Sequence, residues 1–258
     1  MAHEFDGERY AKASDHQKEW GARLIDDLDL VGSERVLDLG CGDGALTARI
    51  ADLVPAGEVV GIDASEGMIA AAHANERPNL HFLLMDIDAL ELADRFDVVF
   101  SNATLHWVKD HRRLYGNVTR LLREGGRVRF NFAAEGNCSH FFAVVREAMA
   151  LDTFSESFLA FDWPWYMPSV GQYAQLVETC GIRDARVWSE NADRFFPSVA
   201  AMVAWVDQPS LVPFMERLPE GPARAFREFV VARMIEETKQ ADGRCFETFR
   251  RINVSATC

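Results

Sequence analysis

Three glycines at alternate positions, Gly40, Gly42 and Gly44, follow a short apolar run and precede a helix-like segment. Because glycine has no Cβ atom, such a turn lets the backbone approach a ligand closely, and the first N–H groups of the helix are available donors. Carboxylates flank the turn at Asp38 and Asp43. They would repel a diphosphate, the usual ligand of a Gly-x-Gly-x-x-Gly turn, and the glycine spacing also differs from that pattern. The stretch therefore favours a cationic small molecule over a dinucleotide.

Polar side chains also end the next three strand-like runs. These runs cover residues 57–63, 80–87 and 96–102, and they carry Asp63, Asp86 and Asn102 at or near their ends. Asp63 lies about twenty residues beyond the glycines, where a carboxylate can accept hydrogen bonds from two ribose hydroxyls. The simpler alternative is that Asp63 belongs to a helix cap and that Asp86 or Asp88 caps a turn.

Alternating strands and helices must position these residues. Leu46, Ile50 and Leu53 fall on one face of a helix after the glycine turn. The run 96–102 is apolar enough for a parallel strand that is buried on both faces. Open sheets of this kind bind ligands at the carboxyl ends of their strands, so the glycine turn and the three polar residues should gather there.

The alternation weakens in the second half of the chain. A fifth strand is expected at 127–132, where Arg129 faces away from the apolar side and should be covered by an inserted segment. After residue 133 the pattern predicts helices at 141–151 and 170–180, a strand at 185–188 and a closing strand at 245–256. Between the last two strands it predicts a helical insertion over roughly 198–239, with helix starts or turns at 197–198 and 219–222.

Two stretches resemble motifs of a known family. Residues 36–44 resemble the first motif of class I S-adenosylmethionine-dependent methyltransferases, whose cofactor carries a sulfonium and an ammonium and so suits the flanking carboxylates. Residues 102–107, Asn-Ala-Thr-Leu-His-Trp, resemble the fourth motif of small-molecule methyltransferases, notably the trans-aconitate methyltransferase group. The resemblance implies an α/β, Rossmann-like sheet of seven strands, mostly parallel with an antiparallel last strand. It also implies helices on both faces and helical lid or cap insertions.

The resemblance also implies a division of the chain and a set of site residues. We expect a single methyltransferase domain, with an N-terminal helical lid at 1–32, a cofactor-binding core at 33–133, further core elements with substrate-cap insertions at 134–240 and the closing strand at 241–258. Asp86 would bond the adenine amino group, and Asn102 would contact the methionine end of the cofactor. The expected cofactor-binding residues in this core are Asp38, Gly40, Cys41, Gly42, Asp63, Ala64, Met68, Asp86, Ile87, Asn102 and Ala103.

The segment before the core predicts a helix that has two possible roles. Residues 14–17, Ser-Asp-His-Gln, form a capping box, and an apolar face continues through Leu28. Related methyltransferases close such a segment over the cofactor, and on that interpretation Tyr10 and Gln17 contact it. Plain packing against the core is the alternative.

Aromatic residues crowd the segment 158–168, which is costly to expose and must therefore be core or pocket wall. On the pocket interpretation it contributes Trp163, Trp165 and Tyr166 to the acceptor site. By resemblance, the fourth motif adds three residues that flank the transferred methyl group: Leu105, His106 and Trp107.

The expected chemistry is methyl transfer by in-line displacement to a small-molecule acceptor, with release of S-adenosyl-L-homocysteine. A carboxylate acceptor is already ionised and needs no general base, but an arginine should hold it. The unranked candidates for that arginine are Arg127, Arg129, Arg194 and Arg251. A hydroxyl or amine acceptor would instead make His106 the catalytic base, with a pKa tuned near neutrality. An acyl-carrier-protein thioester and a non-catalytic cofactor sensor are the other hypotheses.

The amino-acid composition disfavours several classes of binding partner. The 258 residues carry a formal net charge of −13, which disfavours nucleic acid and anionic membranes as partners. The five cysteines show no metal-ligand spacing, and no acidic cluster beside Asn102 suggests a metal. The polar start and the lack of a long apolar run indicate a soluble cytoplasmic protein, which we expect to be a monomer or a weak dimer.

Overall fold

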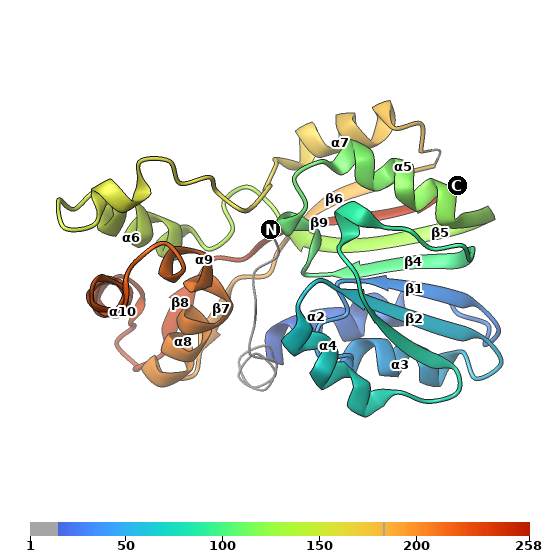
Figure 1. The fold of residues 1–258 in the computed structure, drawn as a ribbon, viewed down its shortest axis with the longest axis horizontal. Helices are drawn as coiled ribbons and strands as arrows, with labels where there is room; N and C mark the ends of the chain where they lie inside the picture. Colours follow the sequence, from blue (N-terminus) through green and yellow to red (C-terminus); the bar gives the residue numbers. More distant parts are fainter. Residues whose placement is uncertain (1–14, 183) are drawn as a thin grey trace. The chain divides into compact units, whose positions relative to one another are not determined.

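The computed structural model describes residues 15–182 and 184–258 (Figure 1). The chain divides into two compact units. Within the described range, the sheet unit comprises residues 15–135, 165–182, 184–190 and 251–258, and the helical unit comprises residues 136–164 and 191–250. In the described part of the chain, no helix has the length and apolar character needed to cross a membrane.

A seven-stranded sheet forms the centre of the sheet unit. Its strands in spatial order are β3 (Leu80–Leu84), β2 (Glu58–Asp63), β1 (Arg35–Leu39), β4 (Phe96–Asn102), β5 (Leu122–Ala133), β9 (Arg250–Thr257) and β6 (Arg186–Asn191). Neighbouring strands from β3 to β5 pair in parallel, whereas β9 pairs with β5 antiparallel, from Arg127 opposite Thr257 to Ala133 opposite Arg251. The predicted Rossmann-like sheet with an antiparallel last strand is therefore confirmed.

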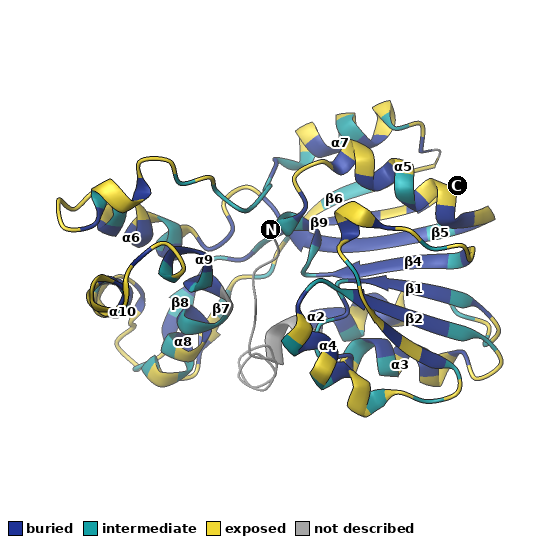
Figure 2. Ribbon diagram, in the orientation of Figure 1, coloured by how far each residue is buried: buried dark blue, intermediate teal, exposed yellow. Residues whose placement is uncertain are grey.

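Helices cover both faces of this sheet because its strand residues alternate between two apolar clusters. Val36, Val98 and Phe100 pack with α2 (Asp15–Asp26), α3 (Ala45–Leu53) and α4 (Glu66–Ala72). On the opposite face, Leu37 and Val99 pack with α5 (His111–Leu121) and α7 (Val170–Thr179). Figure 2 shows the inner strands of the sheet largely buried, whereas the outer strands β3 and β6 carry exposed residues. The helices keep exposed outer faces, as amphipathic helices on a two-sided sheet should. Three short helical turns join these elements: η1 (His73–Asn75), η2 (Ile87–Ala89) and η3 (Leu105–Trp107).

The helical unit is built around aromatic side chains. Its helices are α6 (Ser139–Met149), η4 (Ser155–Phe158), α8 (Val199–Trp205), η5 (Val206–Ser210), α9 (Val212–Met215) and α10 (Glu220–Thr238). Phe141, Phe214 and Phe226 are fully buried among them. Two short strands, β7 (Arg194–Phe196) and β8 (Cys245–Glu247), form a separate antiparallel pair. The buried Glu247 carboxylate accepts hydrogen bonds from the backbone N–H groups of His140 and Phe141, and so satisfies donors at the start of α6.

Several predicted boundaries were wrong. The expected helical insertion at 198–239 comprises several helices, and α10 begins directly after Pro219 as predicted. A further break, which was not predicted, lies at Gln208, which precedes Pro209 and has the extended φ of −146° that a proline imposes on its predecessor. The expected closing strand at 245–256 is two strands, β8 and β9. Strand β5 begins at Leu122, five residues earlier than predicted, with a register irregularity against β4 between Phe96 and Val98.

Arg129 is covered by a core strand and not by an inserted segment. Its guanidinium lies 4.9 Å from the ring centre of Trp188 in β6 and donates to Asn253 Oδ1 at 3.0 Å and to Asp27 Oδ2 at 3.2 Å. Partners on β6, on β9 and directly after α2 therefore compensate the burial of this charge.

Candidate active site

The strand order brings the polar strand ends together at one edge of the sheet. Strands β3, β2, β1 and β4 are consecutive neighbours, so the residues after their carboxyl ends form a row. The chain reverses its direction of winding between β1 and β4, which is the switch point at which open α/β sheets bind ligands. The glycine turn follows β1, and Asn102 ends β4.

The glycine turn is held open against the end of β2. Gly40 and Cys41 donate to the carbonyl of Ile62 at 2.8 and 2.9 Å. Gly40 has a φ of +76°, and a Cβ on it would lie 2.1 Å from Thr104 Cγ2, so no larger residue fits. Gly42 has a φ of +55° and no atom within 4 Å of its Cβ position. Its exposed side can therefore be approached by a ligand.

Asp63 connects this turn to the next helix. Its carboxylate accepts hydrogen bonds from Gly42 N and Ser65 N, both at 3.0 Å, while Ser65 itself caps α4. A carboxylate has about four acceptor positions, so bonds from backbone N–H groups do not by themselves exclude bonds from ribose hydroxyls. The helix-cap alternative and the ligand role are thus compatible. Ala64 lies beside Asp63 and is partly exposed, whereas Met68 is buried in the first turn of α4.

A second carboxylate lies buried under the turn. Asp38 is only 2% exposed and accepts a hydrogen bond from Thr47 Oγ1 at 2.7 Å. Burial raises its pKa to about 7, the Thr47 bond opposes that change, and the negative charge of Asp63 adds to it. Burial and the same two carboxylates also raise the pKa of the Cys41 thiol, which is therefore neutral and unreactive.

The turn after β3 has the local geometry of a cap. Asp86 is exposed, and its side chain accepts a hydrogen bond from Asp88 N at 2.9 Å. Ile87 is buried in the apolar core at 7% exposure, so only its backbone could offer a contact. The adenine-binding role of Asp86 and Ile87 stays a prediction.

The segment after β4 is constrained from several sides. Ala103 has a φ of +58°, a strained value for a residue with a side chain, and its N–H donates to the carbonyl of Asn131 at 2.7 Å. Thr104 Oγ1 donates to Gly40 O at 3.1 Å and so joins this segment to the glycine turn. Helix α2 packs over the same place, because a Cβ on Gly21 would lie 3.0 Å from Asn102 Nδ2. The expected cofactor residues Asn102 and Ala103 therefore lie beside the turn.

His106 does not have the near-neutral pKa expected of a general base. Burial lowers its pKa to about 3, and the positive charge of Arg251 contributes in the same direction. Although part of the residue is accessible, its Nδ1 atom is buried and has no hydrogen-bond partner among the described residues. The imidazole is therefore neutral and weakly basic near neutral pH.

A second histidine, which the sequence did not indicate, fixes the turn that carries His106. The buried His111 lies with Nε2 3.0 Å from Leu105 O, and because a carbonyl can only accept, Nε2 must carry the proton. Nδ1 then accepts from the Tyr173 hydroxyl at 2.8 Å, and the Tyr115 hydroxyl lies 3.2 Å beyond. Burial lowers the His111 pKa to about 4, which keeps this neutral tautomer in place.

The expected acceptor residues belong to both units, and their assembly into one pocket stays a prediction. The Trp107 and Trp165 rings lie 5.2 Å apart, and Tyr166 N donates to His106 O at 2.8 Å. These residues therefore adjoin one another in the sheet unit. Leu105 is fully buried in the apolar core. Trp163 belongs to the helical unit. Tyr10 lies outside the described residues, and for Gln17 the structure describes only its place in α2.

One of the four candidate arginines lies at the binding edge of the sheet. Arg251 pairs with Ala133 at the carboxyl end of β5, and its guanidinium donates to Asn131 Oδ1 at 2.7 Å. The ring of Trp20 lies 4.8 Å from it. Arg127 pairs with Thr257 at the other end of β5, and Arg194 belongs to the helical unit. The position of Arg251 at this edge follows from the register of β9 against β5, which the sequence did not predict.

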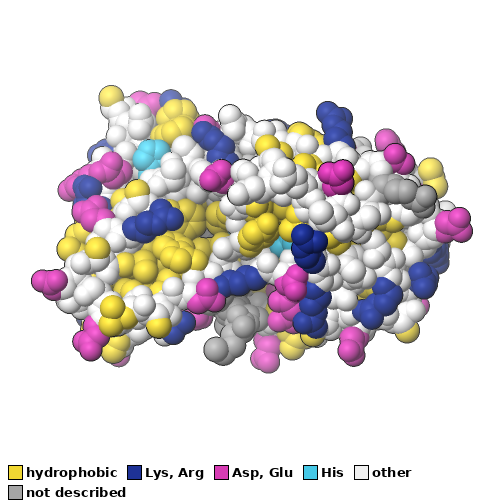
Figure 3. Space-filling view, turned by 90° about the horizontal axis from the view of Figure 1, so that it is seen from above, with side chains coloured by type: hydrophobic (Ala, Val, Ile, Leu, Met, Phe, Trp, Pro, Cys, Tyr) yellow, Lys and Arg dark blue, Asp and Glu magenta, His cyan; other side chains and the backbone are white. Residues whose placement is uncertain are grey.

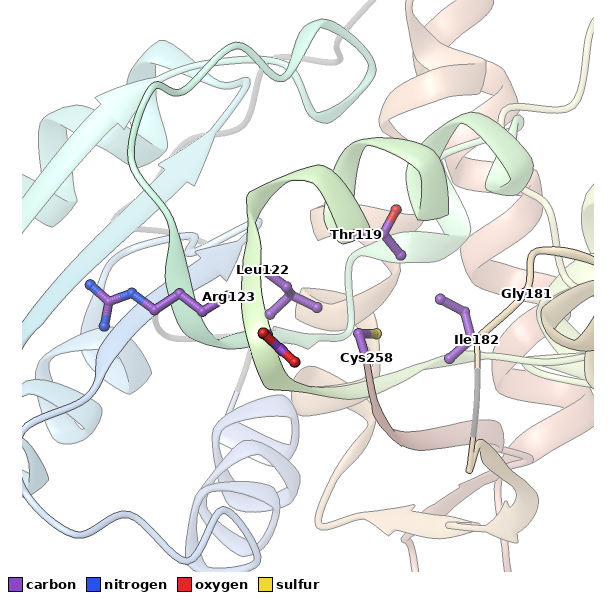
Figure 4. A pocket seen from close by; sticks show the side chains of 7 residues that line it. Thr119, Leu122, Arg123, Gly181, Ile182 and Cys258 are labelled. Carbon is purple, nitrogen blue, oxygen red and sulfur yellow. The ribbon is translucent and has the colours of Figure 1, made fainter.

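A pocket elsewhere in the sheet unit is separate from this edge. It has a volume of about 300 Å³ and is lined by residues that include Thr119, Leu122, Ile182 and Cys258 (Figure 4). Leu122 begins β5 and Cys258 follows β9, so the pocket lies at the end of these strands opposite Arg251. Among the described residues, no group of three or more His, Cys, Asp or Glu side chains could hold a metal ion.

Similarity to known proteins identifies the family. The family described as a methyltransferase domain matches residues 36–126. Trans-aconitate 2-methyltransferase from Deinococcus radiodurans is 30% identical over 228 residues, which cover 86% of both chains. The chain belongs to the class I S-adenosylmethionine-dependent methyltransferases. An uncharacterized methyltransferase of Schizosaccharomyces pombe is 32% identical to it over 96% of this chain and 98% of the relative.

Solved structures support the methyltransferase fold. The YcgJ protein from Bacillus subtilis superposes with a TM-score of 0.64 at 14% identity, over 93% of this methyltransferase and 98% of that chain. A phosphoethanolamine N-methyltransferase from Haemonchus contortus, solved with S-adenosylhomocysteine and phosphomonomethylethanolamine, gives 0.57 at 17% identity over 92% of this chain and 52% of its own. At these identities the likeness establishes the fold alone.

Proposed function

We propose that this methyltransferase transfers the methyl group of S-adenosylmethionine to an oxygen of a small-molecule carboxylate. The observation that carries the proposal is the environment of His106, whose pKa of about 3 makes it a poor base. An ionised carboxylate needs no base, since it carries its nucleophilic electron pair at neutral pH. The names of the trans-aconitate 2-methyltransferase relatives are consistent with this acceptor class.

The cofactor supplies an electrophilic methyl group on a cationic sulfur. The residues after β1 to β4 fit such a ligand, because the open side of Gly42 permits close approach and the Asp63 carboxylate, which binds the same turn, is an acceptor that suits ribose hydroxyls. Asp38 adds a buried carboxyl group whose negative form a nearby cation would stabilise. Asn102 and the strained Ala103 border the same site from β4.

Arg251 is the arginine best placed to hold the acceptor. It lies at the edge of the sheet that carries Asn102, and it is close enough to His106 to lower the pKa of that residue. Asn131 and Trp20 orient the guanidinium before any ligand arrives, which reduces the entropy cost of a two-point contact with a carboxylate. The main catalytic contribution of Arg251 is then to orient the acceptor oxygen toward the methyl carbon.

The step balances without a proton acceptor. The carboxylate oxygen forms a bond to the methyl carbon while the carbon–sulfur bond breaks and its electron pair stays on sulfur. The products are a neutral methyl ester and S-adenosylhomocysteine. Exclusion of water by the Trp107–Trp165 pair would protect the electrophile from hydrolysis.

The test is turnover with methyl-labelled S-adenosylmethionine against trans-aconitate, saturated fatty acids, a malonyl thioester, a catechol and a primary amine. Label in a base-labile ester of one of the acids would support the proposal. Label only on the catechol, the amine or the thioester would overturn the carboxylate assignment. Cofactor binding without transfer to any member of the panel would contradict an enzymatic role for these acceptor classes.

A further inference from the structure

Three large rings form an outer layer on the helical unit. Phe142, Phe161 and Trp163 are each half-buried, and we call them the aromatic surface. Trp163 contacts the other two, with ring centres 5.7 Å from Phe142 and 5.6 Å from Phe161. Phe161 also stacks at 5.0 Å on the fully buried Phe214. The aromatic surface is therefore anchored on the core of the unit while it keeps accessible ring area.

Two arginines lie on these rings. The Arg146 guanidinium is 5.0 Å from the ring centre of Trp163 and 5.9 Å from that of Phe142, and the Arg217 guanidinium is 5.8 Å from that of Phe161. Both arginines are exposed. Figure 3 shows hydrophobic side chains gathered in a broad yellow area on the helical unit, with dark-blue Lys and Arg side chains next to them.

These two cations differ from most others in the helical unit. Carboxylates pair with five of its arginines: Arg224, Arg227, Arg233, Arg244 and Arg250. Within the described part of the chain, Arg146 and Arg217 have no such partner. The chain carries 40 acidic and 27 basic residues, so a shortage of carboxylates cannot explain this. Stacking leaves the in-plane N–H donors of a guanidinium free, and those donors suit a carboxylate from another molecule.

We propose that the aromatic surface, together with Arg146 and Arg217, binds an amphipathic acid, a small molecule with one carboxylate and an apolar chain or ring. The apolar part would cover the rings and release water from them, and the carboxylate would pair with a guanidinium at the margin. This site lies wholly in the helical unit and goes beyond the proposed function, since binding there requires no methyl transfer.

Calorimetric titration of the full-length protein with decanoate, below its micellar concentration, tests the proposal. We expect binding to wild type, and a loss of affinity of about tenfold or more in the Arg146→Gln/Arg217→Gln double variant. Both side chains are exposed, so the variant should keep its melting temperature. Arg224→Gln is the matched control, because Arg224 is an exposed arginine of the same unit that lies on no ring; it should bind decanoate as wild type does.

Two further ligands separate the contributions of charge and apolar area. Decan-1-ol should bind wild type more weakly than decanoate does, because it lacks the carboxylate. The double variant should bind decan-1-ol and decanoate with equal affinity. Acetate should not bind measurably to either protein. Trp163→Ala should weaken both ten-carbon ligands. Absence of decanoate binding to wild type at millimolar concentration, or equal affinity in wild type and the double variant, would overturn the proposal.

This outcome is independent of the acceptor assignment. Decanoate binding that depends on the two arginines would leave the site standing even if no acid were methylated. If the protein methylates an acid but binds decanoate with the same affinity in wild type and in the double variant, the proposed function would be supported and the site on the aromatic surface refuted.

Discussion

Thr47 Oγ1 lies 2.7 Å from Asp38 Oδ2, and both side chains are buried beneath the glycine turn. A hydrogen bond from a hydroxyl stabilises the ionised carboxylate, but it does not outweigh the burial that raises the pKa of Asp38 to about 7. The free protein is thus poised to ionise this group when a cation arrives.

Cofactor affinity should rise with pH because of Asp38. Between pH 5.5 and 7 the ionised fraction of a group with this pKa grows by about sixteenfold, while the ammonium of the cofactor stays charged. We expect the Kd for S-adenosylmethionine to fall by up to that factor in calorimetric titrations, with protein ionisation visible as buffer-dependent heat. In Asp38→Asn the Kd should not vary with pH; an equal pH dependence in the variant would remove Asp38 from the site.

Asp38 should also make the folded protein less stable as the pH rises, whereas it makes cofactor affinity higher. The pKa of Asp38 is raised from 3.8 in the unfolded chain to about 7, so its contribution to folding is complete below about pH 4 and is lost as the pH rises through about 7. Bound cofactor should recover this loss, because it favours the ionised form of the folded protein.

Replacement of Asp63 should weaken cofactor binding at constant pH. In Asp63→Asn, one carboxylate oxygen becomes an NH2 group that faces the N–H of Gly42 or Ser65, and an acceptor for the ribose is lost. We expect a loss of about 1–3 kcal/mol in binding free energy for S-adenosylhomocysteine. Asp52→Asn, at an exposed site on α3, should bind as wild type does. Unchanged affinity in Asp63→Asn would exclude the ribose contact.

The buried His111 should make the protein sensitive to acid. The pKa of His111 falls from 6.5 in the unfolded chain to about 4, so its contribution is present above pH 6.5 and is lost as the pH falls through about 4. Its share of the unfolding free energy is about 3 kcal/mol. Urea unfolding between pH 7 and 4 should show a shallower loss in His111→Gln, which keeps a donor for Leu105 O. Parallel wild-type and variant curves would contradict this assignment.

Arg251 can be tested by separating the kinetic constants. If it holds the acceptor, Arg251→Lys should raise the KM for the acid by about tenfold or more, because a lysine cannot make the two-point contact, while the Kd for the cofactor stays constant. Arg127→Gln, at the other end of β5, should leave the KM unchanged. A loss confined to cofactor affinity would instead place Arg251 on the methionine carboxylate of the cofactor.

The gathering of the polar strand ends at one edge of the sheet could be predicted from the sequence because its signals are local. The glycine turn and the polar residues after three strands each follow an apolar run directly, and the strand order then brings them together. Arg251, Asn131 and His111 could not be ranked in this way, since their places depend on the register of β9 against β5 and on the packing of α5 against α7. The break before Pro209 did have a local signal, which the longer apolar pattern concealed.

The position of β9 has a consequence for the order of folding. In the sheet β9 lies between β5 and β6, yet in the sequence β6 precedes β9 by about sixty residues. During synthesis on the ribosome, β6 therefore emerges with no partner in the sheet and must wait until residues 250–257 arrive. The last strand then inserts between two segments that are already made. We expect this late insertion to be the slow step of folding and the period in which nascent chains most need chaperones.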